Sequence, residues 1–351
     1  MSLRFTYESL PGRVLFGRGA AKERLPAEID ALGATRILVF ATERARSLAE
    51  CIAKPFADRV AGVFADVRPH VPVQVAEQAR EQAAEQRADA LLSIGGGSTI
   101  GTAKIVALTT GLPIVAVPTT LAGSEMTPVW GMTTAARKET GRSIVVLPTV
   151  VVYDPALVET LPRRLAGASA LNGMAHCVEA LWTPTANPVT TIMALQGARA
   201  LAAGIRSEGE DPAGDLLYGA YLSGAAFAVT GSGLHHKICH ALGGAFDLPH
   251  AETHAVVLPH VLAFNASSPE LRDVMTRLAT ALGADDPVSG LAALRREVGS
   301  PETLAALGLT PAQLEEAVGV VSTLLPVHNV RDVTTDGVRT ILNSAYEGRV
   351  P

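Results

Sequence analysis

The chain has few cysteines, no strong excess of either charge and no long apolar run, and each absence argues against a class of protein. Its three cysteines among 351 residues are odd in number and lack the spacing of a zinc site, which disfavours a disulfide scaffold and favours a reducing compartment. The formal net charge of -5 provides no basic field for nucleic acid or an anionic membrane. We therefore expect a small-molecule partner.

The N-terminus and the apolar segments predict a cytoplasmic protein. The opening segment, MSLRFTYESLPGRVLFGRGA, lacks the apolar core and cleavage site of a signal peptide, and no apolar run is long enough to span a bilayer. A chain of 351 residues more often forms two domains than one.

The first part of the chain alternates strand-like and helix-like segments. Helix-compatible stretches lie at 45–57, 73–87 and 99–108, between short apolar runs typical of buried strands at 37–40, 61–64, 90–94 and 114–117. This alternation predicts a parallel, doubly wound α/β sheet whose ligand binds at the carboxyl ends of the strands.

The pattern changes after Asp154-Pro155. Helical patterning then dominates, interrupted by proline, glycine and Asn-Pro breaks, at 166–181, 190–203, 216–228, 270–282, 311–324 and 335–346. The sequence thus predicts an N-terminal α/β domain over residues 1–155 and an all-α domain over residues 156–351.

Six of the nine histidines lie between Gly231 and His260. His236 and His240 stand four residues apart in a segment without proline, so a helix would project both rings from one face. His250 follows a Gly-Gly pair and a proline, where the chain can fold back on that face. A lone histidine is most often a packed residue, but clustered imidazoles suit a metal or proton transfer. We interpret this segment as the functional centre.

A glycine-rich segment at 95–98 follows one predicted strand and opens a helix, which favours a bound phosphate. By itself the segment also fits a tight structural turn, because it is not the G-x-G-x-x-G of a standard dinucleotide fold. A second polar loop, PTTLAGSE at 118–125, follows the next strand, so both loops should line one edge of the sheet. The predicted cofactor-binding residues in the two loops are Gly95, Gly96, Gly97, Ser98, Thr119, Thr120 and Ser124.

The end of the first predicted strand indicates which dinucleotide fits. An acidic residue there usually accepts from the ribose 2'-hydroxyl, but this chain has Ala41 or Thr42 at the position. With Arg44 and Arg46 just beyond, a 2'-phosphate need not be repelled. We expect Thr42 to contact the cofactor, and either NADH or NADPH to be used.

Together these motifs resemble the iron-containing alcohol dehydrogenase family. The resemblance covers most of the chain and rests on GGGSTIGTAK at 95–104, on PTTLAGSE, and on Asp154-Pro155 followed by Leu161-Pro162. It implies a dinucleotide-binding first domain and an oxidoreductase activity. Carried over to this sequence, the family's four metal-ligand positions fall on Asn172, His176, His236 and His250. The family's additional catalytic histidine falls on His240.

Two departures refine the resemblance. Asn172 stands where the family has an aspartate, and Gly101 replaces the aspartate of the glycine loop. With GLHHKICHALGG at 233–244 and the AYEGRVP ending, these departures resemble the maleylacetate reductase branch. That branch implies reduction of maleylacetate and its substituted relatives to 3-oxoadipate, in the breakdown of aromatic compounds, without a required metal.

The catalytic residues that the resemblance implies can support this reduction. They are His176, His236, His240, His250 and Asn172. Hydride addition to a double bond conjugated with a ketone gives an enolate, which hydrogen-bond donors stabilise and a positioned acid protonates. A neutral amide at 172 would also avoid repelling a dicarboxylate substrate, although a helix-start role is the alternative. His235 and His254 are left open as orienting or structural residues.

Three other functions remain open from the sequence. They are a metal-dependent alcohol or glycerol-type dehydrogenase, a lyase of the dehydroquinate synthase type, and a dinucleotide sensor without catalysis. We expect a homodimer that takes a small dicarboxylate and binds neither nucleic acid nor membrane.

Overall fold

The computed structural model describes residues 4–134 and 138–349. The chain divides into two compact units between Thr160 and Leu161, a few residues after the predicted boundary at 155, and each is described here by itself. The segment that ends at Ser9 groups with the helical unit, although it was expected in the first domain. In agreement with this grouping, burial and two nearby tyrosines, Tyr218 and Tyr7, raise the pKa of Tyr221.

The sheet unit is built on six strands in the order β1-β8-β5-β4-β2-β3, and every neighbouring pair is parallel. The strands are β1 (Arg13–Phe16), β2 (Ile37–Phe40), β3 (Val60–Phe64), β4 (Ala90–Gly95), β5 (Ile114–Pro118) and β8 (Val150–Tyr153). The helices are α1 (Ala20–Glu23), α2 (Leu25–Ala31), α3 (Arg46–Ala53), α4 (Val73–Glu85) and α5 (Gly97–Thr110).

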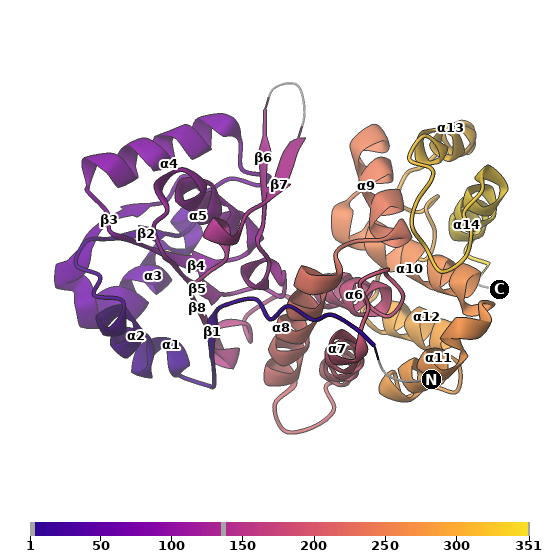
Figure 1. The fold of residues 1–351 in the computed structure, drawn as a ribbon, viewed down its shortest axis with the longest axis horizontal. Coiled ribbons are helices and arrows are strands. Elements are labelled where there is room, and N and C mark those ends of the chain that lie inside the picture. The colour runs from indigo at the N-terminus through magenta and orange to yellow at the C-terminus, as the bar shows by residue number, and fades with distance from the viewer. Residues whose placement is uncertain (1–3, 135–137, 350–351) are drawn as a thin grey trace. The chain divides into compact units, whose positions relative to one another are not determined.

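Helices cover both faces of this sheet, with α1 to α3 on one face and α4 and α5 on the other (Figure 1). Alternate residues of β2 show why: Ile37 and Val39 pack in the core with α1 to α3, whereas Leu38 and Phe40 pack in the core with α4 and α5. Strands buried on both faces need continuous apolar runs, which is how the sequence revealed them. The predicted doubly wound α/β fold is confirmed.

The chain reverses direction across the sheet between β2 and β4. From β2 it runs outward to the edge strand β3, then returns to β4 on the other side of β2. Such a switch point leaves a crevice at the carboxyl ends of the two central strands, where ligands of open α/β sheets bind.

Two parts of the sheet unit were not anticipated. Strand β1 is an edge strand in which only Leu15 is buried, and the antiparallel hairpin β6 (Val129–Thr133) and β7 (Lys138–Arg142) forms a separate small sheet. The apolar run at 143–147 contains a short 3-10 turn, Ile144–Val146, whose first residue is 54% exposed.

The helical unit contains nine α-helices within its described residues, and none of the described helices is both long and apolar enough to cross a membrane. They are α6 (Arg163–Glu179), α7 (Pro188–Arg206), α8 (Pro212–Thr230), α9 (Leu234–Phe246), α10 (His250–Ala266), α11 (Arg272–Ala281), α12 (Pro287–Glu297), α13 (Pro311–Ser322) and α14 (Thr335–Glu347).

Close contacts between α6, α8, α9 and α10 position the histidines. A Cβ on Gly173 of α6 would lie 3.2 Å from the hydroxyl of Ser223, so the small residue lets α6 approach α8. Asp247 ends α9 in the left-handed conformation, with φ of 52°, and α10 begins at His250 after the turn. The chain therefore folds back after α9, as the proline predicted, but the break comes at Asp247 because Gly243 and Gly244 lie inside α9 rather than at a kink.

Candidate active site

The glycine segment lies at the carboxyl end of β4 and continues into the first turn of α5. Gly95 ends β4, Gly96 is the N-cap of α5, and Gly97 is its first residue. The first backbone N–H groups of a helix have no partner within it, and the helix dipole adds partial positive charge there. This end of α5 therefore suits a phosphate group.

The second predicted loop packs against these glycines. The backbone N–H of Thr119 donates to the carbonyl oxygen of Gly95 over 3.0 Å. A Cβ on Gly96 would lie 2.9 Å from two atoms of Thr120, so a larger residue would fill the space between the loops. The two loops do line the same edge of the sheet, while cofactor binding by Ser98 and the other loop residues stays a prediction.

Lys104 supports the second loop from inside. It is 1% exposed, and its Nζ donates to the carbonyl oxygens of Ser124 at 2.6 Å, Thr127 at 2.7 Å and Val129 at 2.9 Å. Burial lowers the pKa of Lys104 to about 7, although the charge of Glu125 opposes this shift. The hydroxyl of Ser124 is buried and has no hydrogen-bond partner within the described residues, so it is an unused polar group beside the glycines.

Thr42 lies just after the carboxyl end of β2, the strand that pairs with β4 where the chain reverses direction. Its Oγ1 accepts from the backbone N–H of Ala45 over 3.3 Å and so starts a short turn. The neighbouring Glu43 is paired with Arg46, with a hydrogen bond of 3.0 Å. The strand end thus offers a hydroxyl rather than a free carboxylate, which agrees with use of either cofactor.

The predicted histidines form one cluster in the helical unit. His236 and His240 both project from α9 with ring centres 6.1 Å apart, which confirms that they share a face. His176 of α6 stacks on His236 at 5.0 Å, and His250 of α10 stacks on His240 at 5.9 Å. Three helices therefore contribute to one set of imidazoles.

His254, left undecided from the sequence, occupies the centre of this cluster. Its ring centre lies 4.9 Å from that of His236, 4.5 Å from that of His250 and 4.8 Å from that of His235. His235 and His254 are fully buried, and a hydrogen bond of 2.9 Å joins Nε2 of the first to Nδ1 of the second. Burial, reinforced by neighbouring histidines, lowers the pKa of His235 to about 3 and that of His254 well below its usual value. Both rings are therefore neutral at neutral pH.

The cluster has a buried part and an exposed part. His236 and His176 are 3% and 9% exposed, whereas His240 and His250 are exposed to solvent. Burial, and then the nearby His236, lower the pKa of His176, whose ring packs 4.4 Å from that of Phe227 on α8. A substrate can thus reach the exposed pair, while the buried rings hold the cluster in place.

Asn172 lies within α6 rather than at its start, so the alternative of a helix-start role is wrong. Its Oδ1 and the Nδ1 of His176, one turn later, are both buried and have no hydrogen-bond partner among the described residues. Unpartnered polar atoms of this kind are uncommon in folded proteins. They mark a polar site beside the cluster.

Glu179, at the end of α6, belongs to the cluster although the sequence analysis did not single it out. Its carboxylate is fully buried, and it accepts from Nδ1 of His236 at 2.5 Å and from the backbone N–H groups of Gly233 at 2.9 Å and His235 at 2.6 Å. Burial raises the pKa of Glu179, but His236 and the hydrogen bonds lower it overall. The available signal was a lone acidic residue in an apolar helix, because buried acids are rare unless they are paired.

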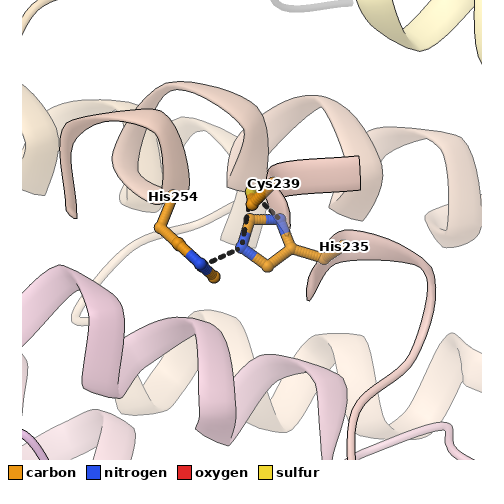
Figure 2. Close-up of side chains that lie close together, drawn as sticks. All are labelled: His235, Cys239 and His254. Carbon is orange, nitrogen blue, oxygen red and sulfur yellow. Dashed lines mark hydrogen bonds between the residues drawn. The ribbon is translucent and has the colours of Figure 1, made fainter. Parts of the chain in front are cut away.

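Two groups of described side chains bring potential metal ligands within 4.8 Å of one another. The first is His235, Cys239 and His254 (Figure 2). The 2.9 Å between the two ring nitrogens is shorter than the roughly 3.3 Å between nitrogens on one tetrahedral zinc ion. Burial also raises the pKa of Cys239, so the metal-binding thiolate is disfavoured. This group is a hydrogen-bonded core.

The second group is His240, His250 and His254, which contains no carboxylate. Three imidazoles can hold zinc with an open position. The family resemblance implies a different set of four metal-ligand positions, at Asn172, His176, His236 and His250. This set suits a metal cation less well, because Asn172 is neutral where the family has an aspartate. His176 and His236 also lie outside this second group.

Comparisons with known proteins cover almost the whole chain. Residues 11–155 match the family described as iron-containing alcohol dehydrogenase, and residues 166–346 match the Fe-containing alcohol dehydrogenase family, C-terminal. The chain belongs to the iron-containing alcohol dehydrogenase family. Its sheet unit and helical unit correspond to the two matched regions.

Among iron-containing alcohol dehydrogenases, the chain belongs to the maleylacetate reductase branch. It is 44% identical to the maleylacetate reductase of Burkholderia cepacia over 352 residues, which is 99% of this chain and 99% of that relative. The solved maleylacetate reductase from Agrobacterium tumefaciens has a TM-score of 0.94 and 37% identity, with 100% of both chains covered. An iron-containing alcohol dehydrogenase from Corynebacterium glutamicum has a TM-score of 0.93 and 45% identity, with 99% and 98% covered. The chain is therefore an NAD(P)-dependent oxidoreductase.

Proposed function

We propose that the chain reduces the carbon–carbon double bond of maleylacetate and substituted maleylacetates to give 3-oxoadipate, with NADH or NADPH. The observation that carries the proposal is the histidine cluster with the neutral Asn172 where the family has a carboxylate. Whole-length identity to named maleylacetate reductases supports the same substrate.

Within the described residues, the cluster presents no unpaired negative charge to a dianionic substrate. The buried rings of His176, His235 and His254 have lowered pKa values and are neutral, and the buried carboxylate of Glu179 beside them is held by three hydrogen bonds. An aspartate at position 172 would add a negative charge close to the substrate, whereas an amide adds a hydrogen-bond donor.

The reaction requires side chains that stabilise an enolate and that deliver a proton to one of its carbons. When bound, the dinucleotide supplies the hydride to the alkene carbon farther from the ketone. The electron pair of the double bond then moves towards the ketone oxygen, and the alkene carbon next to the ketone takes a proton. We expect His240 and His250, which are exposed on α9 and α10, to donate to the oxygen or the carbon; their exposure and their closeness to each other and to His236 support this assignment.

We also propose that this reaction requires no metal. The charge of such an enolate is spread over a conjugated system, so hydrogen-bond donors can take the place of a Lewis acid. The lack of an anionic side chain at position 172 supports this proposal. Chelator-treated enzyme should therefore keep its reductase activity, and a loss of activity restored by one divalent cation would contradict the proposal.

A metal-dependent alcohol or glycerol-type dehydrogenase is the second candidate. The group formed by His240, His250 and His254 favours it, since three imidazoles suit zinc. Activity on simple alcohols or aldehydes that depends on added metal would support this candidate.

One assay separates these functions. Oxidation of NADH and NADPH is followed with maleylacetate and with a panel of simple aldehydes and ketones, each with and without chelator. We expect turnover with maleylacetate alone, in the presence of chelator and with either cofactor. Failure with maleylacetate alongside turnover of an aldehyde would overturn the proposed substrate.

Cytoplasmic location and a homodimer are part of the same proposal. The use of three free cysteines without a disulfide supports a reducing compartment. Cell fractionation tests the location, and sedimentation analysis of the purified protein tests the dimer.

A further inference from the structure

The buried carboxylate of Glu179 is bound on every side by groups of α9 and the turn before it. Its Oε1 accepts from the backbone N–H of His235 at 2.6 Å. Its Oε2 accepts from the backbone N–H of Gly233 at 2.9 Å and meets Nδ1 of His236 at 2.5 Å. Within the part of the chain that the structure describes, these are the hydrogen-bond partners of the side chain. The contact with His236 is the only one of them whose hydrogen can move.

This arrangement decides which ring nitrogen of His236 carries the hydrogen. A carboxylate accepts hydrogen bonds and donates none, so Nδ1 must be the protonated nitrogen. The other nitrogen, Nε2, is buried and has no hydrogen-bond partner among the described residues. The ring is held against rotation because His176 stacks on it at 5.0 Å and Phe227 packs 5.2 Å away. Nε2 is therefore left unused by the fold.

We propose that Glu179 is a positioning residue: it fixes His236 as the Nδ1–H tautomer and so presents the lone pair of Nε2 to the site. For catalysis, this inference rests on the proposed reductase function, in which the Nε2 lone pair accepts a hydrogen bond from the acid that protonates the substrate carbon and so orients that acid. Glu179 itself touches neither substrate nor cofactor. The same carboxylate also binds the free N–H groups at the start of α9, so it ties α6 to the helix that carries three of the histidines.

The substitution Glu179→Gln gives a sharp test. With its oxygen at the Oε1 position, the amide still accepts from the N–H of His235, while its NH₂ at the Oε2 position loses the bond from the N–H of Gly233 and donates to Nδ1 of His236. Nδ1 must accept, so the hydrogen moves to Nε2. In protein labelled with ¹⁵N-histidine, the two ring nitrogens give distinct signals in each tautomer, and His236→Gln identifies which signals belong to this ring.

We expect wild-type enzyme to show hydrogen on Nδ1 of His236 and Glu179→Gln to show it on Nε2. The variant should lose about 10²-fold in kcat for maleylacetate, the lower end of the worth of a positioned acid or base. Its KM for NADH should stay within about threefold, because the effect is on the chemical step. Glu179→Asp, which keeps an acceptor, should retain the wild-type tautomer.

Glu28→Gln is the matched control. Glu28 is also buried, at 7% exposed, but pairs with Arg13 in the sheet unit at 3.0 Å. Its substitution removes a buried carboxylate and should leave both the His236 signals and kcat unchanged.

Several results would overturn the inference. One is wild-type enzyme with its hydrogen on Nε2, which needs no variant to fold. Another is a reversed tautomer in Glu179→Gln with kcat unchanged, and a third is lost stability with the wild-type tautomer retained. If wild-type enzyme shows the expected tautomer but does not reduce maleylacetate, the proposed substrate fails while the role of Glu179 stands.

Discussion

His240 and His250 are the exposed members of the cluster, and their exposure separates catalysis from stability. Substituting either with alanine should lower kcat by about 10²–10⁴, the usual worth of a positioned acid or hydrogen-bond donor. The melting temperature and the affinity for NADH should hardly change, because neither ring is buried and the predicted cofactor residues belong to the other unit. Turnover, melting temperature and NADH affinity are measured on the same variants.

His254 serves as the contrasting variant in that experiment. It is fully buried and bonded to His235, so His254→Ala should lower the free energy of unfolding by about 1–3 kcal/mol through the unsatisfied partner. Near-normal turnover in both exposed variants, with lower melting temperatures, would show that the histidines only pack the helical unit.

Thr42 sets the expected balance between cofactors. Thr42→Asp should favour NADH over NADPH by about tenfold or more, since one polar contact is worth about 1–3 kcal/mol and a carboxylate repels a 2'-phosphate. Aspartate is also a good N-cap, so the turn that Thr42 starts should persist. The ratio of kcat/KM values with the two cofactors gives the result, and an unchanged ratio would remove Thr42 from the cofactor site.

At the residue scale, the sequence predicted the cluster but not its internal bonds. The four-residue spacing of His236 and His240 shows in any helix, so their shared face could be predicted. The link from Glu179 to His236 spans 57 positions and depends on how α6 meets α9. No local pattern reports such a contact, and the same holds for the bond between His235 and His254.

At the scale of single elements, α5 begins at the glycine segment after β4, and its residue Lys104 anchors the loop that follows β5. Lys104→Met keeps the apolar stem of the side chain but removes the Nζ hydrogen bonds to three carbonyl oxygens of the loop. We expect the loop to loosen and the dissociation constant for NADH to rise by about tenfold, which corresponds to about 1.4 kcal/mol. At saturating NADH, kcat should change little. Titration of NADH fluorescence measures the effect.

The exposed Lys54 provides the control, because Lys54→Met removes a lysine of the same unit without touching the loop. Equal NADH affinities for the two variants would show that the loop does not depend on Lys104.

Asp89 joins the segments that precede β2 and β4. Its carboxylate accepts from the hydroxyl of Thr35 at 2.6 Å and from the backbone N–H groups of Thr35 and Arg36 at 2.9 Å. Partial burial raises the pKa of Asp89, but these hydrogen bonds lower it overall. A carboxyl with a lowered pKa stabilises the fold above its unfolded value of about 3.9 and loses that contribution as pH falls through the folded value.

Asp89→Asn should therefore lower the melting temperature near neutral pH, and the difference in melting temperature from wild type should narrow as the pH falls below about 4. Thermal unfolding at a series of pH values measures this difference. A difference that stays constant with pH would mean that the charge of Asp89 does not contribute.

Elements buried on both faces were the easiest to predict from the sequence. Strand β4 is buried along its whole length and appears as an apolar run in which Ser93 is the one polar residue. Strand β1 has a single buried residue, and the β6–β7 hairpin packs largely outside the main core, so neither gives such a run. The positions of glycines at the end of β4 were visible in sequence, but their contact with Thr120 depends on the pairing of β4 with β5.

At the scale of the whole molecule, the two-domain plan followed from the change from alternating strands and helices to helices alone. The resemblance supplied the family, which the comparisons confirm, while the domain boundary needed the structure. The segment up to Ser9 has no pattern that assigns it to the helical unit, because that assignment depends on contacts with residues beyond Leu161.

The grouping of the segment up to Ser9 with the helical unit affects the order in which the protein folds during translation. The sheet unit, Leu10–Thr160, is continuous in sequence and can fold while the ribosome is still translating the helices. The segment before it is translated earlier than the sheet unit, yet its partners in the helical unit emerge only after that unit, and contacts so far apart in sequence form slowly. Deleting residues 4–9 would therefore disturb the helical unit, although the whole sheet unit separates the two in sequence.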